Sequence, residues 1–545
     1  MHEHDCGTLT YRPFPAKPIP RQRLPETFMQ PTRPTIDPSF KTVANVFQSD
    51  AEIVVALVPS LGTDDDSEGK SADLAVLAGR LDAEDAMRLE RLAAAERFEG
   101  GLGNVLKLPL GGDGPKMLLV SGLGSSLDAT TGGRNAPPDL SSSDRDRIVR
   151  AAACAMRSLP SRQPSRIGFF WDAPSAPANE SDAAIVGLLT GLDGQGLLKT
   201  TAKRSDIAAV AVEGMDPETI DHGRAVGLSI NATRRLVNMP ANEIYPESFC
   251  AQVQPIAEAC GLEVEIWDAD RLARENCRAM LAVGRASKFP PHLLILRHRG
   301  GGDGDPPTAI VGKGVTFDSG GLSIKPSASM LDMKCDMAGA ATVVGTLLAA
   351  ARLNLPRNVV GVCGLAENMI AGDAYRLGDV IETRSGKTIE IHNTDAEGRV
   401  VLSDTLDVVA DMKPRAIVDL ATLTGACMVA LGTETTGLMS NDADLQSSIQ
   451  NAAAREGEPA WPLPMFSLFD EHVKSKVADL RNVGNGRWGG AITAAKFLEP
   501  FVRGLPWCHM DIAGPAFADS PESHRDAGAT GTMVRSLVRF LRESV

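Results

Sequence analysis

The sequence lacks an excess of basic residues, since 55 lysines and arginines face 69 acidic residues and give a net charge of −14. This balance argues against a general affinity for nucleic-acid backbones or anionic membranes. No uninterrupted apolar run reaches the roughly 18 residues that a membrane span needs. The longest apolar run, "MAGAATVVGTLLAAA" at 337–351, is rich in small residues and ends at Arg352. We therefore expect a packed internal helix at this position. We expect neither nucleic acid nor a membrane to be a partner of the protein.

A disulfide framework and a structural zinc module are also not expected. The nine cysteines are odd in number, scattered and without a CxxC pair, which is typical of reduced thiols in a cytosolic protein. The first 40 residues lack the apolar core of a secretory signal and contain eight prolines. We therefore expect residues 1–41 to form a proline-rich arm and the protein to be cytoplasmic.

The chain length of 545 residues predicts two domains. The first expected domain, 42–216, alternates apolar strand patterns with helical patterns, and its Pro/Gly/Ser-rich segment 128–145 is expected to be a surface insertion. We expect a linking helix at 217–238 and a C-terminal domain at 239–545. In the first domain we expect strands at 51–59, 116–124, 166–172 and 207–214, and helices at 71–98 and 144–159.

The C-terminal part contains near-continuous apolar strands separated by helical runs, such as "HLLILRHR" at 292–299 and "TAIVGKGVTF" at 308–317. That pattern is typical of a sheet buried on both faces. We therefore predict an α/β protein whose larger C-terminal domain is doubly wound around a mainly parallel central sheet. Functional sites of such sheets lie at the carboxyl ends of the strands.

Three segments place charged or small polar residues near these predicted strand ends. In 308–345 an apolar strand contains Lys313 between two glycines. In 378–412 Ser385-Gly386-Lys387 predicts a hairpin turn, with a returning strand that ends at Asn393 and a helix that begins near Ala396. In 415–432 a strand leads into small residues that suit close approach of a substrate. The residues concerned are Lys313, Asp318, Lys325, Asp336, Asp395, Glu397, Arg399, Thr422, Thr424 and Gly425.

Each of these features alone has an ordinary explanation. A carboxylate in the first turn of a helix, such as Asp336 or Asp395, usually caps the helix and complements its dipole. "GKGVT" is no phosphate-binding loop, because Pro307 occupies the required glycine position. Together, however, four converging carboxylates would repel one another unless cations neutralised them. Two divalent ions would do so, and an oxygen-rich ligand set suits Mg, Mn or a Zn pair.

The same segments resemble the signature segments of the leucyl aminopeptidase family of two-metal exopeptidases, family M17. The resemblance rests on "VGKGVTFDSGGLSIKP", "DMKCDMAGAATV" and "NTDAEGR", and continues through "DLATLTGA", "GRWGGAITAAKFL", "WCHMDIAGPA" and "GATG". It covers 217–545 and is only architectural upstream. Val400 stands where the family usually has leucine, a change that we expect to affect only packing.

The resemblance implies a leucyl aminopeptidase in which Asp318 and Glu397 bridge two divalent ions (Zn, Mn, Co or Mg). Asp395 then completes the more exchangeable site, and Lys313 and Asp336 complete the tighter one. Lys325 is implied to stabilise the oxyanion and Arg399 to hold a bicarbonate ion that acts as general base. The implied substrate pocket contains Met333, Asn393, Thr422, Leu423, Gly425 and Ala513.

The same resemblance implies a homohexamer that admits short peptides with a free N-terminus and prefers leucine or methionine there. We expect His392 to be a strand residue rather than a catalytic one. One alternative is a DNA-binding accessory protein on an aminopeptidase scaffold, which the negative net charge disfavours. An inactive family member, and a transferase or a hydrolase of glycine dipeptides with the same site, are further alternatives.

Overall fold

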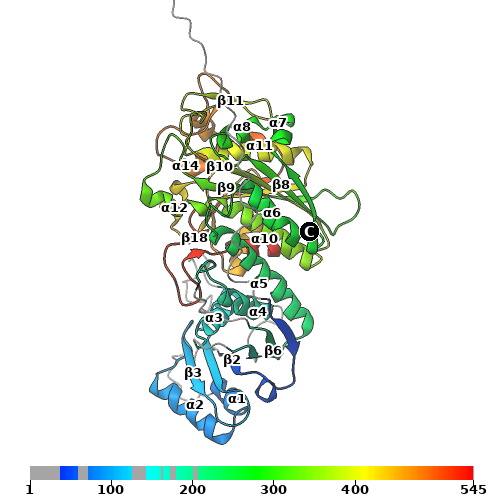
Figure 1. The fold of residues 1–545 in the computed structure, drawn as a ribbon, viewed down its shortest axis with the longest axis vertical. Coiled ribbons are helices and arrows are strands. Elements are labelled where there is room, and N and C mark those ends of the chain that lie inside the picture. Colours follow the sequence, from blue (N-terminus) through cyan, green and yellow to red (C-terminus); the bar gives the residue numbers. More distant parts are fainter. Residues whose placement is uncertain are drawn as a thin grey trace, which may run out of the picture.

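A computed structural model describes residues 37–58, 72–124, 143–160, 164–171, 180–200 and 207–543 (Figure 1). Two sheets with their helices lie one above the other, and helix α5, Pro217–Asn238, runs between them. The predicted surface insertion at 128–145 lies largely outside the described residues, as does the predicted arm up to residue 36. Strand β1, Ser39–Thr42, begins within the range expected for that arm, and it pairs with strand β6.

The first sheet has six strands in the order β1-β6-β5-β2-β4-β3. Neighbouring strands are parallel except β3 and β4, which are antiparallel. The predicted strands of this region are all present, with slightly shorter bounds. The six strands are β1 Ser39–Thr42, β2 Ile53–Val58, β3 Val105–Pro109, β4 Met117–Gly122, β5 Arg166–Phe170 and β6 Ala209–Glu213.

The helix predicted at 71–98 is wrong as a single helix. The chain forms α1, Ala72–Ala78, and α2, Ala83–Ala95, because Asp82 caps the second helix by accepting a hydrogen bond from the backbone N–H of Asp85. Helices α3, Asp144–Arg157, and α4, Asp182–Leu192, pack against each other, and α4 also packs against α5. Their apolar side chains form a core with one face of the first sheet.

The predicted helix at 217–238 is present with the same bounds. Asp216 caps its first turn through the backbone N–H of Thr219, and Pro217 occupies the first helical position, where no N–H is needed. The helix ends before Pro240, which could not continue it. Since α5 packs against α4 on one side and α10 on the other, it joins the two sheets.

The second sheet has eight strands in the order β15-β14-β17-β13-β9-β10-β8-β7, and its central strands β17, β13, β9 and β10 are parallel. This mixed sheet with a parallel centre confirms the predicted α/β class. The strands are β7 Glu263–Trp267, β8 His292–Arg299, β9 Thr308–Asp318, β10 Asn358–Asn368, β13 Ala416–Ala421, β14 Thr436–Ser440, β15 Ala460–Pro462 and β17 Trp507–Asp511.

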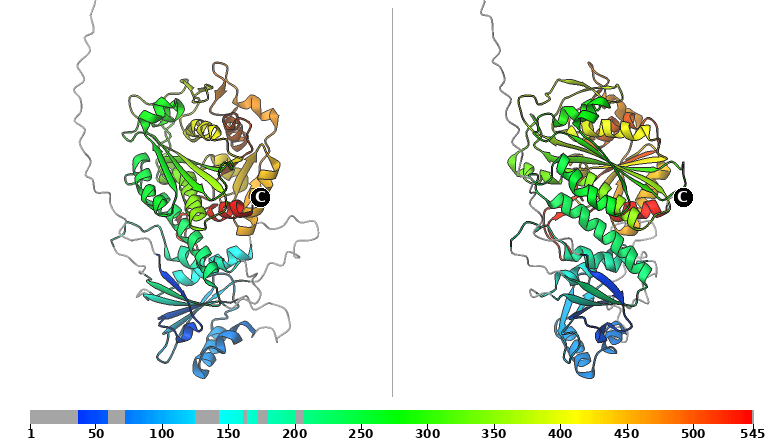
Figure 2. Two further views of the ribbon diagram at one scale, coloured as in Figure 1. Left: turned by 90° about the vertical axis from the view of Figure 1, so that its right-hand side faces the viewer. Right: turned by 45° about the vertical axis from the view of Figure 1, so that its right-hand side comes forward.

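Helices cover both faces of the second sheet (Figure 2), and two separate apolar cores fill the spaces between. The core on one side contains residues of α6, α10, α13 and α15, and the core on the other contains residues of α8, α11 and α14. The helices are α6 Pro246–Ala259, α7 Ala269–Arg274, α8 Arg278–Gly284, α9 Ser327–Met330, α10 Ala338–Arg352, α11 Glu397–Asp411, α12 Gly425–Leu431, α13 Ala443–Glu456, α14 Gly490–Leu498 and α15 Val534–Glu543.

Helix α10 confirms the packed internal helix predicted at 337–351. The helical run Met333–Arg352 is the one described segment long and apolar enough to cross a membrane, yet 89% of its apolar window is buried inside the protein. Small side chains let it approach the central strands closely. A Cβ at Gly339, for example, would lie 2.2 Å from the carbonyl oxygen of Leu420.

The remaining strands are short. Val380–Glu382 (β11) and Thr388–Glu390 (β12) form the predicted hairpin around Gly386, and β12 also pairs with β16, Leu480–Arg481. Strand β12 ends at Glu390 and not at Asn393 as predicted, because the next three residues turn away to begin the loop before α11. Strands β18, Phe517–Ala518, and β19, Gly528–Ala529, pair with each other.

Candidate active site

The charged residues singled out in the sequence meet near the carboxyl ends of β9, β10 and β13. Asp318 ends β9, whereas Lys313 lies in the interior of the same strand rather than at its end. Asp336 lies in a 3₁₀ turn, Met333–Met337, that leads into α10. Glu397 begins α11, and Asp395 lies in the loop before it. Four separate elements thus bring these side chains to one place.

Lys313 connects two of the carboxylates. Its Nζ lies 2.8 Å from Oδ2 of Asp336 and 2.9 Å from Oε1 of Glu397, and all three side chains are buried. The lysine passes directly against Gly398, where an added Cβ would lie only 2.4 Å from Lys313 Cε. The glycine in "NTDAEGR" therefore leaves room for this lysine.

Lys325 connects the other two carboxylates. Its Nζ lies 2.9 Å from Oδ2 of Asp318 and 2.6 Å from Oδ1 of Asp395. The loop that carries Lys325 back over the strand end turns at Gly320 and Gly321, whose φ angles of +83° and +61° favour glycine. A Cβ at Gly320 would also lie 2.8 Å from Asp395 Oδ1.

Neutral side chains fix the orientation of these carboxylates. Asn368, at the end of β10, donates hydrogen bonds to Oδ1 of Asp318 (2.8 Å) and to the carbonyl oxygen of Thr394 (3.0 Å). Tyr375 donates its phenol hydrogen to the same Thr394 carbonyl, at 2.8 Å. Thr422 donates from Oγ1 to Oδ1 of Asp336, at 2.7 Å. The acidic groups are therefore held in place by the surrounding loops.

The electrostatics of the cluster indicate a need for additional positive charge. Burial, followed by repulsion from Glu397, raises the pKa of Asp318 to about 6. Burial also raises the pKa of Asp336 well above its usual range. Burial alone would lower the pKa of Lys313, but attraction to Asp336, Glu397 and Asp318 outweighs it and raises that pKa. The buried carboxylates hence cannot all remain ionised beside a single pair of lysines.

The donor set fits divalent cations. Carboxylate oxygens of Asp318, Asp395 and Glu397 all lie within 4.8 Å of one another. Oε2 of Glu397 is buried and has no hydrogen-bond partner among the described residues. A buried carboxylate oxygen without a partner is costly unless a cation binds it. Oxygen ligands with one amine are suited to Mg, Mn or Zn.

Arg399 lies in the first turn of α11 and is also buried. Its Nη1 donates to the carbonyl oxygen of Asn482 at 3.0 Å, while its Nε has no hydrogen-bond partner among the described residues. Burial lowers the pKa of this guanidinium to about 10, against the opposing attraction of Glu397 and Asp511. A buried guanidinium with a free N–H is suited to an oxyanion.

The expected pocket residues lie on four segments of the chain. Leu423 and Ala513 each donate a backbone hydrogen bond to Oδ1 of Asp511, at 3.2 and 3.1 Å. Gly425 is the first residue of α12, and a Cβ there would meet no atom within 4 Å. The others are Met333 in the 3₁₀ turn, Asn393 in the loop before α11, and Thr422 after β13.

The structure corrects one residue and adds others. His392 is not a strand residue, since it follows the end of β12 and lies half-exposed, 3.0 Å from Oε2 of Glu390. Sequence reasoning missed Asn368, Asp511 and Asn482, which hold the site loops. The sequence could have indicated Asn368 and Asp511, because each is a polar residue at the end of an apolar strand.

Comparison with known proteins identifies the family. Residues 231–538 match the model of the cytosol aminopeptidase family, catalytic domain. A protein of Rhodopirellula baltica named "Probable cytosol aminopeptidase" is 52% identical over 492 residues, which cover 90% of this chain and 94% of that protein. The chain belongs to the cytosol aminopeptidase family. As a member of that family it is an aminopeptidase, so the cluster of carboxylates and lysines and the expected pocket residues form the candidate active site of a peptidase.

Solved structures of family members agree with this assignment. A mutant of tomato leucine aminopeptidase is 30% identical, with a TM-score of 0.80, and the match covers 94% of this chain and 98% of that one. The bottromycin maturation enzyme BotP in complex with Mn is 33% identical, with a TM-score of 0.76, and the match covers 90% of this chain and 99% of that one. A manganese-bound relative supports divalent metal binding by this family member.

Proposed function

We propose that this aminopeptidase releases leucine or methionine from the N-terminus of short peptides with the help of two divalent ions. The observation that supports this proposal is the convergence of four carboxylates, two lysines and one buried arginine at one sheet edge, next to the open space at Gly425.

The two ions would share Asp318 and Glu397 as ligands. Asp395 would complete one site, and Lys313 and Asp336 would complete the other. When bound, a pair of divalent ions lowers the pKa of a water molecule and polarises the peptide carbonyl. Lys313 would ligate as a neutral amine, because nearby dications favour loss of the ammonium proton that the carboxylates alone retain.

Lys325 would stabilise the developing negative charge, and Arg399 would hold the general base. Lys325 Nζ stays protonated beside Asp318 and Asp395, whose attraction outweighs burial and raises its pKa. Its N–H groups would donate to the oxygen that gains negative charge in the transition state, a contribution of about 10²–10³ in rate. Arg399 would hold a bicarbonate ion through its unpartnered Nε–H, and this ion would supply a general base to the site.

Substrate preference would follow from the pocket lining. Met333 and Leu423 pack against the two apolar cores and offer apolar surface, while Gly425 leaves space beside them. An unbranched or γ-branched apolar side chain such as methionine or leucine would bury its area there.

We also propose that the protein is a cytoplasmic homohexamer. The eight described cysteines are free thiols, which suits a reducing compartment. Several large apolar side chains of the catalytic part are exposed, among them Leu331 (78%), Val429 (90%) and Trp488 (69%), and contact with further subunits would bury them. Analytical ultracentrifugation would test this assembly, and a monomer at micromolar concentration would contradict it.

The decisive experiment is hydrolysis of leucine amide by protein stripped with chelator and then supplied with Mn, Co, Zn or Mg, with bound metal counted per chain. Activity that returns in step with a second bound ion would support the two-metal proposal and identify the working cation. Two bound ions without hydrolysis of any amino-acid amide would contradict it. Two of the three relatives quoted above are named aminopeptidases and none is named as a DNA-binding protein, so the DNA-binding alternative gains no support.

A further inference from the structure

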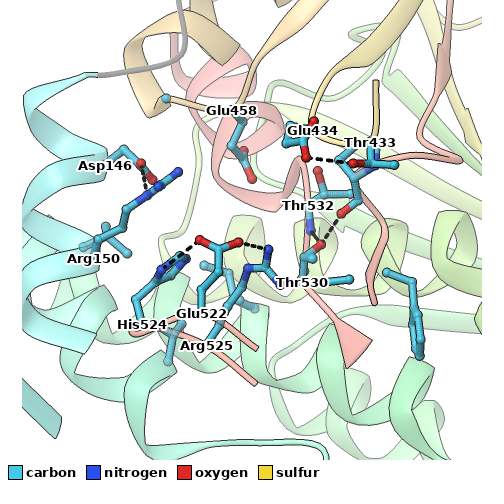
Figure 3. Close-up of a pocket in the computed structure, with 18 of the residues that line it drawn as sticks. Asp146, Arg150, Thr433, Glu434, Glu458, Glu522, His524, Arg525, Thr530 and Thr532 are labelled. Carbon is cyan, nitrogen blue, oxygen red and sulfur yellow. Dashed lines mark hydrogen bonds and ion pairs between the residues drawn. The ribbon is translucent and has the colours of Figure 1, made fainter. Parts of the chain in front are cut away.

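One cavity lies away from the candidate metal ligands. A cavity of about 560 Å³ lies between α3, α5 and the segment 514–535 (Figure 3), and none of the metal-ligand candidates, nor Lys325 or Arg399, lines it. Glu522, His524 and Arg525 extend into it between Arg150 of α3 and Thr530. Segments far apart in the sequence therefore build this cavity together.

The cavity contains guanidinium groups whose hydrogen-bonding capacity is not fully used. Four arginines line it: Arg150, Arg234, Arg525 and Arg535. Arg525 contacts Glu522 through Nη2, and Arg535 contacts Asp146 through Nη2 at 2.9 Å. Nη1 of Arg525 and Nη1 of Arg535 are both buried and have no hydrogen-bond partner among the described residues. Two buried N–H donors without an acceptor are costly.

Four of the five acidic residues that line the cavity have partners among the described residues, Glu434 through the hydroxyl of Thr433, and the fifth, Asp519, is exposed. Asp146 lies within ion-pair distance of Arg150 (2.5 Å) as well as Arg535. Glu458 accepts hydrogen bonds from the backbone N–H of Met533 (2.9 Å) and from the hydroxyl of Ser536 (2.6 Å). Glu522 lies 3.6 Å from His524 in addition to its contact with Arg525. What the cavity lacks is therefore an acceptor rather than a cation.

The pKa of His524 depends on the burial of the imidazole and on the charges around it. Burial, and after it the charges of Arg150, Arg525 and Arg535, lower the pKa of this imidazole to about 3. Burial is the main cause, and the arginine charges act in the same direction because the guanidinium groups lie near the imidazole.

We propose that this cavity binds a small oxyanion, either phosphate or a carboxylate, between the guanidinium groups of Arg525 and Arg535. A planar guanidinium matches the oxygen geometry of both groups. Bound there, the oxyanion would satisfy the two unpartnered nitrogens. It would also contact the segment Gly514–Pro515, which directly follows the pocket residue Ala513.

Isothermal titration of the metal-loaded full chain with inorganic phosphate, at an ionic strength kept constant with sodium chloride, tests the proposal. We expect saturable binding with one site per chain that depends on Arg525 and Arg535. Arg525→Gln should weaken it about tenfold or more, since a charge-assisted hydrogen bond is lost. Arg299→Gln is the matched control, because this arginine is 67% exposed and pairs with Glu263 far from the cavity. Its affinity for phosphate should equal that of the unchanged protein.

A parallel titration with acetate distinguishes the two sources of the oxyanion: a carboxylate ligand is indicated if acetate binds in an Arg525-dependent way and phosphate does not. Hydrolysis of leucine amide by Arg525→Gln shows that the variant is folded. If it does not fold, Arg535→Gln, which removes the other guanidinium of the proposed site, takes its place. Absence of binding by both anions overturns the proposal. So does phosphate binding that remains unchanged in the cavity variants, since that anion would then bind elsewhere.

Discussion

Asn368 donates a hydrogen bond of 2.8 Å from Nδ2 to Oδ1 of Asp318, and the two residues face each other as partners at the ends of the parallel strands β10 and β9. The same Nδ2 donates to the carbonyl oxygen of Thr394, at 3.0 Å. One neutral amide therefore sets the positions of a proposed bridging ligand and of the loop that carries Asp395.

Replacing Asn368 with alanine should weaken metal binding. The carboxylate of Asp318 would lose its orienting donor, a change that typically costs 10–100-fold in metal affinity. Metal titration followed by leucine amide hydrolysis gives the apparent Kd of the weaker ion. Asn358→Ala, at the opposite end of the same strand, is the control and should leave that Kd unchanged. An unaltered Kd in Asn368→Ala would show that the amide has no such role.

Lys325→Ala should lower kcat for leucine amide by at least about tenfold while both ions stay bound, because the variant loses a donor to the charge that develops in the transition state. Steady-state kinetics with metal counted per chain measure both quantities. Lys476→Ala, which removes an exposed lysine, is the control and should keep the original kcat. An unchanged kcat in Lys325→Ala would refute the proposed role.

Glu397→Ala should remove bound metal, because a ligand shared by both ions would be lost. Elemental analysis of the purified variant after dialysis measures the ion count. Glu382→Ala is the matched control, since this carboxylate is about half-exposed and pairs with Arg278 at the surface. If Glu397→Ala still retained two ions per chain, the proposed bridging would be wrong.

Gly425→Val should change substrate preference. The new side chain would extend into space that no described atom occupies within 4 Å of a Cβ, where the proposal places the substrate side chain. Hydrophobic pockets discriminate about 10–200-fold per methylene group. We therefore expect kcat/KM to fall for leucine amide by about tenfold or more, and to change much less for alanine amide. Equal losses for both amides would argue against this position of the pocket.

Arg145→Met should destabilise the protein in a pH-dependent way. Arg145 is buried and lies 2.5 Å from Asp182 and 2.7 Å from Glu456. Burial raises the pKa of Asp182, but Arg145 and His222 outweigh it, so the net pKa is lowered. Asp182 therefore stabilises the fold above its unfolded pKa of about 3.9, and that contribution is lost as the pH falls through its lowered folded pKa. Without Arg145, Asp182 would keep only His222 and Glu456 only its C-terminal arginine partners, and loss of one partner of a buried ion pair costs about 3–5 kcal/mol near neutral pH.

Thermal unfolding at pH 7 and pH 5 measures this effect. The Tm of Arg145→Met should fall clearly at pH 7 and approach that of the unchanged protein at pH 5, where protonation reduces the charge on the carboxylates that have lost Arg145. Arg166→Met removes an arginine that is 52% exposed and should have little effect at either pH. A Tm difference independent of pH would show that packing, and not charge, explains the loss.

The local sequence pattern by itself determined much of the secondary structure of this protein. Apolar runs gave four strands of the first sheet and the central strands β9, β10 and β13 of the second, and the helical spacing at 217–238 gave the bounds of α5. The same patterns fixed the hairpin at Gly386 and the packed helix α10. Where a polar residue competed with a helical pattern, as Asp82 did by capping α2, the expectation of one long helix was wrong.

The charged residues of the candidate site could be predicted from the sequence because they lie in short motifs. Which atoms meet was decided by the register of β9 against β10 and by the glycine turns at 320–321, since contact between Lys313 and Glu397 joins residues 84 positions apart. The orienting amides and the cavity beside Arg535 depend entirely on such long-range packing. A sequence pattern records what one segment prefers, whereas the unpartnered nitrogens of Arg525 and Arg535 exist only after distant segments have buried them together.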